Sequence, residues 1–151
     1  MSEITFVKAD ASNVADVAQY FALEQKMSGS KMYAVSKDEA EAKEDLEKTE
    51  VYFIKLGDKI IGSTSYEIKE PGEAYLAGLL IDPEFQGQGI ARQAIEFRLD
   101  KVKDFKRVWV RTHPHNSKII HLYFSYGFVI EKWIDNFHGD GEPRLILARE
   151  K

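Results

Sequence analysis

Two glycines in the middle of the chain, Gly87 and Gly89, carry its clearest chemical signal. They lie in the segment 86–91, between an apolar run that ends at Ile81 and an amphipathic segment over 91–102. Glycine adopts positive φ and lets the backbone approach a ligand closely. A helix that starts here also presents unpaired N–H groups and the positive end of its dipole. The pattern predicts an anion site, most naturally for phosphate, although an ordinary strand-to-helix turn has the same composition.

One tyrosine and three histidines are the side chains best suited to moving protons. Tyr123 follows Ile120 at helical spacing, so it belongs to the inner face of a helix, either as a core residue or as a proton donor. His113, His115 and His121 are further titratable candidates near the end of a strand. No carboxylate or cysteine is spaced to complete a metal site with the histidines, so we expect no metal.

Seven strands and four helices are expected to position these residues. Alternating or continuous apolar residues predict strands over 4–8, 51–56, 59–68, 74–81, 107–112, 128–133 and 145–148. Helical spacing, with Val14, Val17, Ala18 and Phe21 on one apolar face, predicts the first helix after a cap at Asp10, Ser12 or Asn13. The second helix is expected from a cap at Ser36 to about Lys48, the third over 91–102, and the fourth from Asn116 or Ser117 to Gly127.

The order β-α-α-β-β-β-α-β-α-β-β predicts an α/β fold with one mixed seven-stranded sheet and helices on both faces. The strand over 74–81 should pass through the third helix to a parallel neighbour over 107–112. The last two strands should be antiparallel. In the fourth helix, Ile120, Tyr123 and Phe124 are expected to face inward.

The totals of the chain restrict its class. Its 151 residues predict a single domain over 1–151. The absence of cysteine excludes disulfides and cysteine nucleophiles. A net charge of −4 argues against a nucleic-acid partner. No apolar run approaches the ~20 residues of a membrane span, and the start lacks a signal-peptide pattern, so we expect a cytoplasmic protein with no membrane partner.

The segment 36–50 is the most acidic part of the chain. It holds seven acids against three lysines. Such a run is typical of a solvated helix face. The other interpretation is an acidic lip that attracts a cationic substrate.

Together, these features resemble the GNAT family, the Gcn5-related N-acetyltransferases. The family signature is Gln or Arg, two residues of any kind, Gly, one residue of any kind, and Gly or Ala. The chain matches it fully with Gln86, Gly87, Gln88, Gly89, Ile90 and Ala91. The approach over 80–85 and the later Asn116, Tyr123 and Gly127-Phe128 also resemble family segments. The resemblance is strong over about residues 50–130 and weak before them.

The resemblance implies acetyl-CoA as co-substrate. The backbone of the segment 86–91 would then cradle the CoA pyrophosphate, in agreement with the anion site inferred above. Leu79, Leu80 and Ile81 would lie along the pantetheine arm, with the Leu79 N–H aimed at the thioester carbonyl. Asn116 would touch the arm as well as begin its helix. Tyr123 would be the general acid that protonates the departing thiolate, with Tyr126 a neighbour on the same face.

The general base is where the sequence departs from the family pattern. Many members place a glutamate four residues before the position of Leu79, and this chain has Tyr75 there. Glu73 lies two residues earlier on the same side of the strand and is the candidate base, with a histidine or a water chain as alternatives.

The implied function is transfer of acetyl to a primary amine. The acceptor can be a small amine, a polyamine, or a peptide or protein amine. The alternative is a GNAT-fold module that binds acyl-CoA for regulation without turnover. The sequence does not distinguish acetyl from longer acyl groups, and a homodimer is compatible with the fold.

Overall fold

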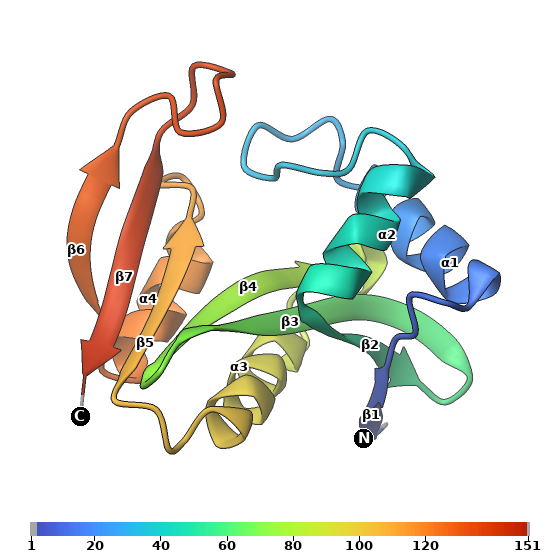
Figure 1. Cartoon of the computed structure of the whole chain (residues 1–151), viewed down its shortest axis with the longest axis horizontal. Coiled ribbons are helices and arrows are strands. Elements are labelled where there is room, and N and C mark those ends of the chain that lie inside the picture. The colour runs from blue at the N-terminus through green and yellow to red at the C-terminus, as the bar shows by residue number, and fades with distance from the viewer. Residues whose placement is uncertain (1–2, 151) are drawn as a thin grey trace.

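The computed structural model describes residues 3–150 as one sheet with helices on both faces (Figure 1). Residues 1, 2 and 151 of the expected domain lie outside the described residues. The strands are β1 (Ile4–Lys8), β2 (Glu50–Leu56), β3 (Lys59–Glu70), β4 (Glu73–Ile81), β5 (Arg107–Thr112), β6 (Val129–Ile134) and β7 (Arg144–Glu150). The helices are α1 (Val14–Gln25), α2 (Glu39–Lys48), α3 (Ile90–Lys101) and α4 (Ser117–Ser125), with a short 3₁₀ turn, η1, at Pro83–Phe85.

The strands form one seven-stranded sheet in the order β1-β2-β3-β4-β5-β7-β6. The β4–β5 pair is parallel and every other neighbouring pair is antiparallel. The expected mixed sheet, the parallel neighbours around α3 and the antiparallel final pair are therefore confirmed. The parallel pair joins two antiparallel halves, and it becomes the centre of the candidate site.

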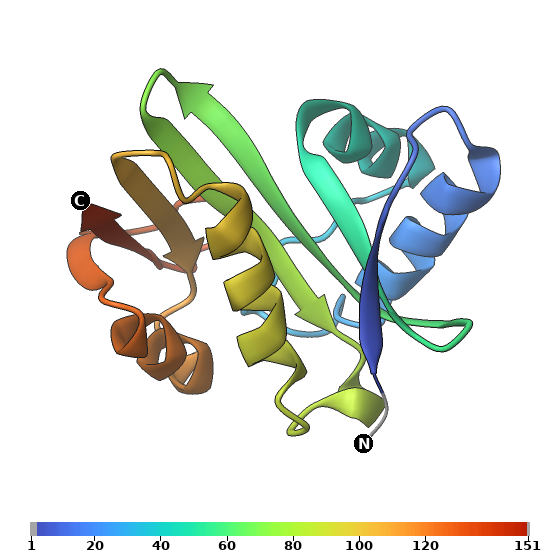
Figure 2. The same cartoon turned by 90° about the horizontal axis from the view of Figure 1, so that it is seen from below.

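Two helices cover each face of the sheet. On one face, α1 and α2 pack on β2 through Val17, Ala42, Leu46, Val51 and Phe53. Figure 2 shows α3 and α4 on the opposite face. None of the helices in the described part of the chain is long and apolar enough to span a membrane.

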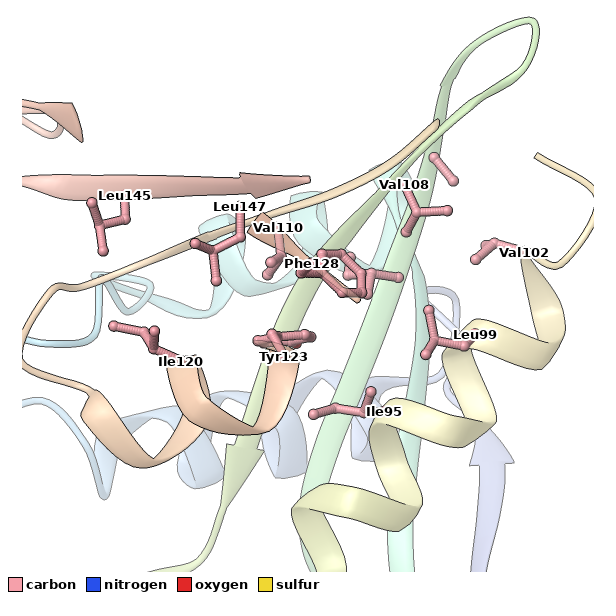
Figure 3. Packing of buried hydrophobic residues seen from close by; sticks show 12 residues of the cluster. Ile95, Leu99, Val102, Val108, Val110, Ile120, Tyr123, Phe128, Leu145 and Leu147 are labelled. Atoms are coloured by element: carbon pink, nitrogen blue, oxygen red, sulfur yellow. The ribbon is translucent and has the colours of Figure 1, made fainter. Parts of the chain in front are cut away.

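The largest core cluster lies under α3 and α4. Ile95 and Leu99 of α3 and Ile120 of α4 meet Val108 and Leu147 of the sheet (Figure 3). Tyr123 lies among them and is 2% exposed. The cluster spans β4, β5 and β7, so it ties together the two halves of the sheet on either side of the parallel pair.

The end of α4 explains how Tyr123 is held in this core. Gly127 has φ of +88°, and its N–H donates to the carbonyl of Phe124. The N–H of Phe128 donates to the carbonyl of Tyr123. These two bonds form a Schellman motif, which needs a residue at positive φ. The chain then turns directly into β6, as the glycine at this position predicts.

Three local expectations are wrong. The N-cap of α2 is Asp38, whose carboxylate accepts the N–H of Glu41 at 2.9 Å, because Ser36 is buried two residues before it. Val14 opens α1 and is 83% exposed, because it precedes the turn that packs on the sheet. Phe124 is 41% exposed, because only Ile120 and Tyr123 of α4 point into the core.

Candidate active site

The parallel strands separate halfway along their length, and this opens the site. Pairing of β4 with β5 runs from Glu73 to Leu76 and ends at the Leu76–Val110 pair. The rest of β4 stays paired with β3 alone. We call the opening between β4 and β5 beyond this pair the splay. Its edge consists of β4 backbone groups that β5 no longer covers.

The alternation of hydrogen bonds decides which of these backbone groups face the splay. The N–H of Asp82 donates to the carbonyl of Ile61 in β3 at 2.8 Å. In an antiparallel pair, every second residue exchanges bonds with its partner, so Leu80 and Gly78 also face β3. The N–H groups of Leu79 and Ile81 therefore point away from β3 and into the splay.

A cleft of about 610 Å³ opens at the splay. Segments from both halves of the sheet line it, together with residues of all four helices and of the two connections over 26–38 and 135–143. The two connections both lie at the top of Figure 1. Of the site residues expected from the sequence, the cleft brings together Leu79, Leu80, Asn116 and Tyr123, with His113 among the titratable candidates. The remaining ones lie outside its lining.

Tyr123 reaches the cleft from the core side and contacts a buried arginine. Its hydroxyl oxygen lies 2.6 Å from Nη2 of Arg98 on α3. A guanidinium has only donors, so the tyrosine oxygen must accept this bond. The hydroxyl proton therefore remains available to another acceptor. Tyr126, the neighbouring tyrosine, instead donates to Glu96 at 2.5 Å on the exposed surface.

Arg98 was missed in the sequence, although a signal was present. It is fully buried and lies between Ile95 and Leu99 on the apolar face of α3. Its Nη1 lies 3.4 Å from the carbonyls of Ser65 and Gly78, and its Nε has no hydrogen-bond partner. A charged residue on a buried helix face is expected to have a specific role, because burying an incompletely paired charge is costly.

The glycine turn has the geometry of an open cradle. Gly87 and Gly89 have φ of +81° and +78°, and a Cβ at either position would meet no atom within 4 Å. The requirement for glycine is therefore conformational, and the space above the turn is free. No side chain caps the start of α3, and its first turn contains no acid. Gln86 folds back, donating from its side chain to the carbonyl of Ile81 at 3.0 Å.

This turn lies outside the lining of the cleft, at the end of β4 that follows the splay. Gln88, Ile90 and Ala91 belong to the turn and the first residues of α3. A ligand that follows the free edge of β4 from Leu79 would arrive at this helix N-terminus. The two halves of the expected cofactor site thus lie along one path.

Asn116 is at the N-cap position of α4 but makes no capping hydrogen bond. Its side chain is instead placed beside the hydroxyl of Tyr33, from the connection between α1 and α2. Burial raises the pKa of Tyr33, and the hydrogen bond from Asn116 opposes that rise. Both residues line the cleft, so helix capping does not account for this asparagine.

The structure does not bring Glu73 to the other site residues. Glu73 begins β4, where its carboxylate lies 3.9 Å from Nε of Arg107, and it is absent from the cleft lining. Six residues separate it from Leu79, about 20 Å along an extended strand. Glu67 of β3 is paired in register with Tyr75 and does line the cleft. It places a carboxylate beside the position at which many family members carry their glutamate.

Both ring nitrogens of His113 are engaged in hydrogen bonds within the fold. His113 is 1% exposed, and its Nδ1 accepts the backbone N–H of His115 at 3.0 Å. Its Nε2 must then carry the proton, which it donates to Glu142 at 2.7 Å. This bond ties the end of β5 to the connection over 135–143. Within residues 3–150, no group of three metal-ligating side chains is arranged around a common point.

An acidic corner, made of Glu24, Glu41 and Asp45, borders the cleft where α1 and α2 meet it. Burial raises the pKa of Glu24 to about 7, against opposing hydrogen bonds from Ser36. Burial also raises the pKa of Asp45, which a hydrogen bond from Tyr20 opposes. The acidic segment noted in the sequence is thus partly a lining of the cleft, rather than only a solvated face.

Comparisons with known proteins agree with this geometry. The model of the acetyltransferase (GNAT) family matches residues 18–128. A search of curated proteins found no significant match.

Solved structures share the fold over nearly the whole chain. The ribosomal-protein-S18-alanine N-acetyltransferase of Escherichia coli is 20% identical with a TM-score of 0.77, covering 99% of this chain and 94% of its own. A GNAT family acetyltransferase from Elizabethkingia anophelis with acetyl-CoA bound is 20% identical with a TM-score of 0.76, covering 98% of each chain. A Bacillus subtilis acetyltransferase in complex with CoA is 17% identical with a TM-score of 0.74, covering 100% of this chain and 99% of its own.

Proposed function

The chain belongs to the acetyltransferase (GNAT) family, and on this premise we propose that it transfers the acetyl group of acetyl-CoA to a primary amine. The single observation that carries the proposal is the splay. It aligns a free backbone N–H, at Leu79, and a buried phenol, at Tyr123, on one cleft. The solved GNAT structures with acetyl-CoA or CoA bound support the choice of co-substrate.

The described residues fit acetyl-CoA at both ends. The turn at Gly87 and Gly89 offers free space, an uncapped helix start and no acid, which suits a pyrophosphate. The edge of β4 at Leu79 and Ile81 offers backbone groups that an amide-containing arm can pair with, like an added strand. When bound, acetyl-CoA supplies an activated acyl carbon and a thiolate leaving group.

Two groups of the chain act on the reaction. The Leu79 N–H donates to the carbonyl oxygen of the thioester, which becomes negative as the amine attacks. Tyr123 gives its hydroxyl proton to the departing sulfur. Arg98 keeps the phenol oxygen oriented, and its guanidinium lies next to the negative charge that this oxygen carries once the proton has left. The amine loses one proton to a base, a proton returns from the base to Tyr123 through solvent, and the products are an N-acetyl amine and free CoA thiol.

We propose Glu67, rather than Glu73, as the group that receives the amine proton. Glu67 lines the cleft beside Tyr75, whereas Glu73 is engaged with Arg107 outside it. The carboxylate of Glu67 also forms an ion pair with Lys69 at 3.3 Å. Its place on β3, directly across from the position of the family glutamate on β4, favours transfer through a water molecule.

An acceptor screen with a thiol readout tests the function. Acetyl-CoA is mixed with a panel of amines and amino-terminal peptides, and released CoA thiol is followed with time. Amine-dependent thiol release, lost in Tyr123→Phe and lowered in Glu67→Gln, is the expected result. Binding of acetyl-CoA without release with any amine would favour the alternative, a regulatory acyl-CoA-binding module. Glu73→Gln serves as the matched control for Glu67→Gln.

A further inference from the structure

Two arginines stand at the end of the cleft opposite the acidic corner. Arg144 begins β7 and is 3% exposed, and Arg111 lies near the end of β5. Both line the cleft. We call Arg111 and Arg144 the basic pole. Its geometry is independent of the family motifs, which lie on β4, α3 and α4.

Neither guanidinium of the basic pole forms an ion pair with a carboxylate among the described side chains. Arg144 donates from Nη1 only to the carbonyl of Pro143 at 2.9 Å, and its Nη2 has no partner. Arg111 lies over the ring of Phe137, at 4.3 Å, and that of Tyr75, at 5.3 Å. These rings hold the Arg111 guanidinium in place without neutralising it.

The nearest carboxylates are occupied elsewhere. Asp140 accepts the backbone N–H of Glu142 at 2.9 Å, and Glu142 is bound to His113 at 2.7 Å. Burial lowers the pKa of Arg144; Asp140 opposes this, and Arg111 lowers it further. Burial lowers the pKa of the neighbouring His138, and Arg111 and Arg144 add to that effect. Asp140 and Glu142 are the carboxylates near this positive charge, and neither forms an ion pair with Arg111 or Arg144.

A third donor faces the same cleft. Nε1 of Trp109 is buried without a hydrogen-bond partner, and Trp109 precedes Arg111 by one alternation of β5. A buried carboxyl group can become neutral by gaining a proton, but a buried guanidinium keeps its charge. Leaving that charge without a partner therefore costs folding free energy. Arg111, Arg144 and Trp109 place donors around one cavity wall, and Nη2 of Arg144 and Nε1 of Trp109 have no protein acceptor, so together they form a site for an anion. A planar carboxylate matches the fork of a guanidinium.

We propose that the acceptor is a small amine that also carries a carboxylate, and that the basic pole binds this carboxylate. The proposal rests on the acetyltransferase function proposed above. The cleft volume of about 610 Å³ suits a small molecule. The basic pole fixes the carboxylate, and the amine points toward Leu79 and Tyr123. The acidic corner makes the opposite prediction, a second cationic group, and the two are distinguished directly by experiment.

Matched acceptors test the proposal by turnover. γ-Aminobutyrate, n-butylamine and putrescine share an amine on three methylene groups and differ in the end group, which is a carboxylate, a methyl group or an ammonium-bearing methylene group. Glycine with ethylamine and β-alanine with n-propylamine repeat the comparison at shorter lengths. For at least one length, the amino acid is expected to have a kcat/KM at least about tenfold above that of its alkylamine. Equal values at all lengths, or a preference for putrescine, would overturn the proposal.

Variants assign the preference to the basic pole. Arg144→Gln is expected to remove the preference for the amino acid over its alkylamine, and Arg111→Gln to reduce that ratio of kcat/KM values by about tenfold. The second variant keeps the test decisive if the first folds poorly. Lys132→Gln is the matched control, since it removes a positive charge from the exposed strand β6 outside the cleft. A preference that survives both arginine substitutions would also overturn the proposal.

A binding measurement separates this proposal from the function on which it rests. Calorimetric titration compares N-acetyl-γ-aminobutyrate with N-butylacetamide, with CoA present, and needs no turnover. The wild-type protein is expected to bind the carboxylate at least about tenfold more tightly, and Arg144→Gln to bind both alike. Tighter binding without any acetyl transfer would refute the proposed function but support the anion site. Acetyl transfer without tighter binding of the carboxylate would support the proposed function but refute the anion site.

Discussion

Replacing Tyr123 with phenylalanine removes one oxygen at the point where the proposed chemistry and the core meet. The hydroxyl is the partner of Arg98 Nη2 at 2.6 Å, and both side chains are buried. The ring itself packs against Phe128 with ring centroids 5.2 Å apart, and a phenylalanine ring at this position would keep that contact. The substitution therefore acts on the proton and on the arginine rather than on core volume.

Two effects of different size are expected. Loss of a general acid lowers kcat by about a hundredfold or more. Loss of a buried hydrogen bond to a charged group costs about 2 kcal/mol. Because Arg98 Nε already has no partner, the substitution would leave a second nitrogen of this buried guanidinium unpaired. In a chain of this length, that corresponds to a decrease in Tm of roughly 4–8 °C. The KM for acetyl-CoA should change little, since the splay and the glycine turn are untouched.

Steady-state thiol release and thermal unfolding measure the two effects on the same preparation. Tyr126→Phe is the control, because its hydroxyl bonds Glu96 on the surface. It should leave kcat and Tm near wild type. A Tyr123→Phe enzyme with wild-type kcat at saturating acetyl-CoA would refute the acid role. A decrease in kcat equal to that of Tyr126→Phe would refute it as well.

The described contacts support three further predictions. Gly89→Asp should raise the KM for acetyl-CoA at least about tenfold, whereas Gly72→Asp, at a similar φ of +82°, should not; equal KM values would contradict the cradle. In urea unfolding, Glu24→Gln should be more stable than wild type by about 3 kcal/mol near pH 8 and similar to it near pH 5. Burial raises the pKa of Glu24 from 4.5 to about 7, so the wild-type protein loses stability as pH rises through that window. A difference that does not depend on pH would contradict this. Glu142→Gln should speed amide hydrogen exchange over 135–143 by weakening the bond from His113, with Glu131→Gln as a control that leaves this exchange unchanged.

The elements were predictable because their patterns are local. Alternation identified β5, helical spacing identified α3, and a glycine at positive φ identified the end of α4. Errors arose where two neighbouring residues could both account for the same local signal. Ser36 and Asp38 both suit an N-cap, and only packing in the cleft decides that Ser36 is buried and Asp38 caps α2.

Only the part of the site that belongs to sequence motifs was predictable, which is the proposed cofactor side. The glycine turn and Tyr123 have fixed spacing in the chain, so sequence reasoning reached them. Glu73 was selected by alternation along one strand, and alternation carries no information on where β4 and β5 separate. Arg98 and Glu24 both lie on otherwise apolar helix faces, a signal that was present in the sequence. Arg144 gave none, because it is the first residue of β7 and precedes the apolar run that predicted the strand.

The most direct test of the central account follows the acetyl group itself. Acetyl-CoA labelled in its acetyl carbon is mixed with the protein and the amine found in the screen, and mass spectrometry locates the label in a single turnover. Label that passes straight to the amine, with none on the protein and with loss of transfer in Tyr123→Phe, is the predicted result. Label that remains on CoA while acetyl-CoA is bound would contradict the account, as would an acetylated protein intermediate.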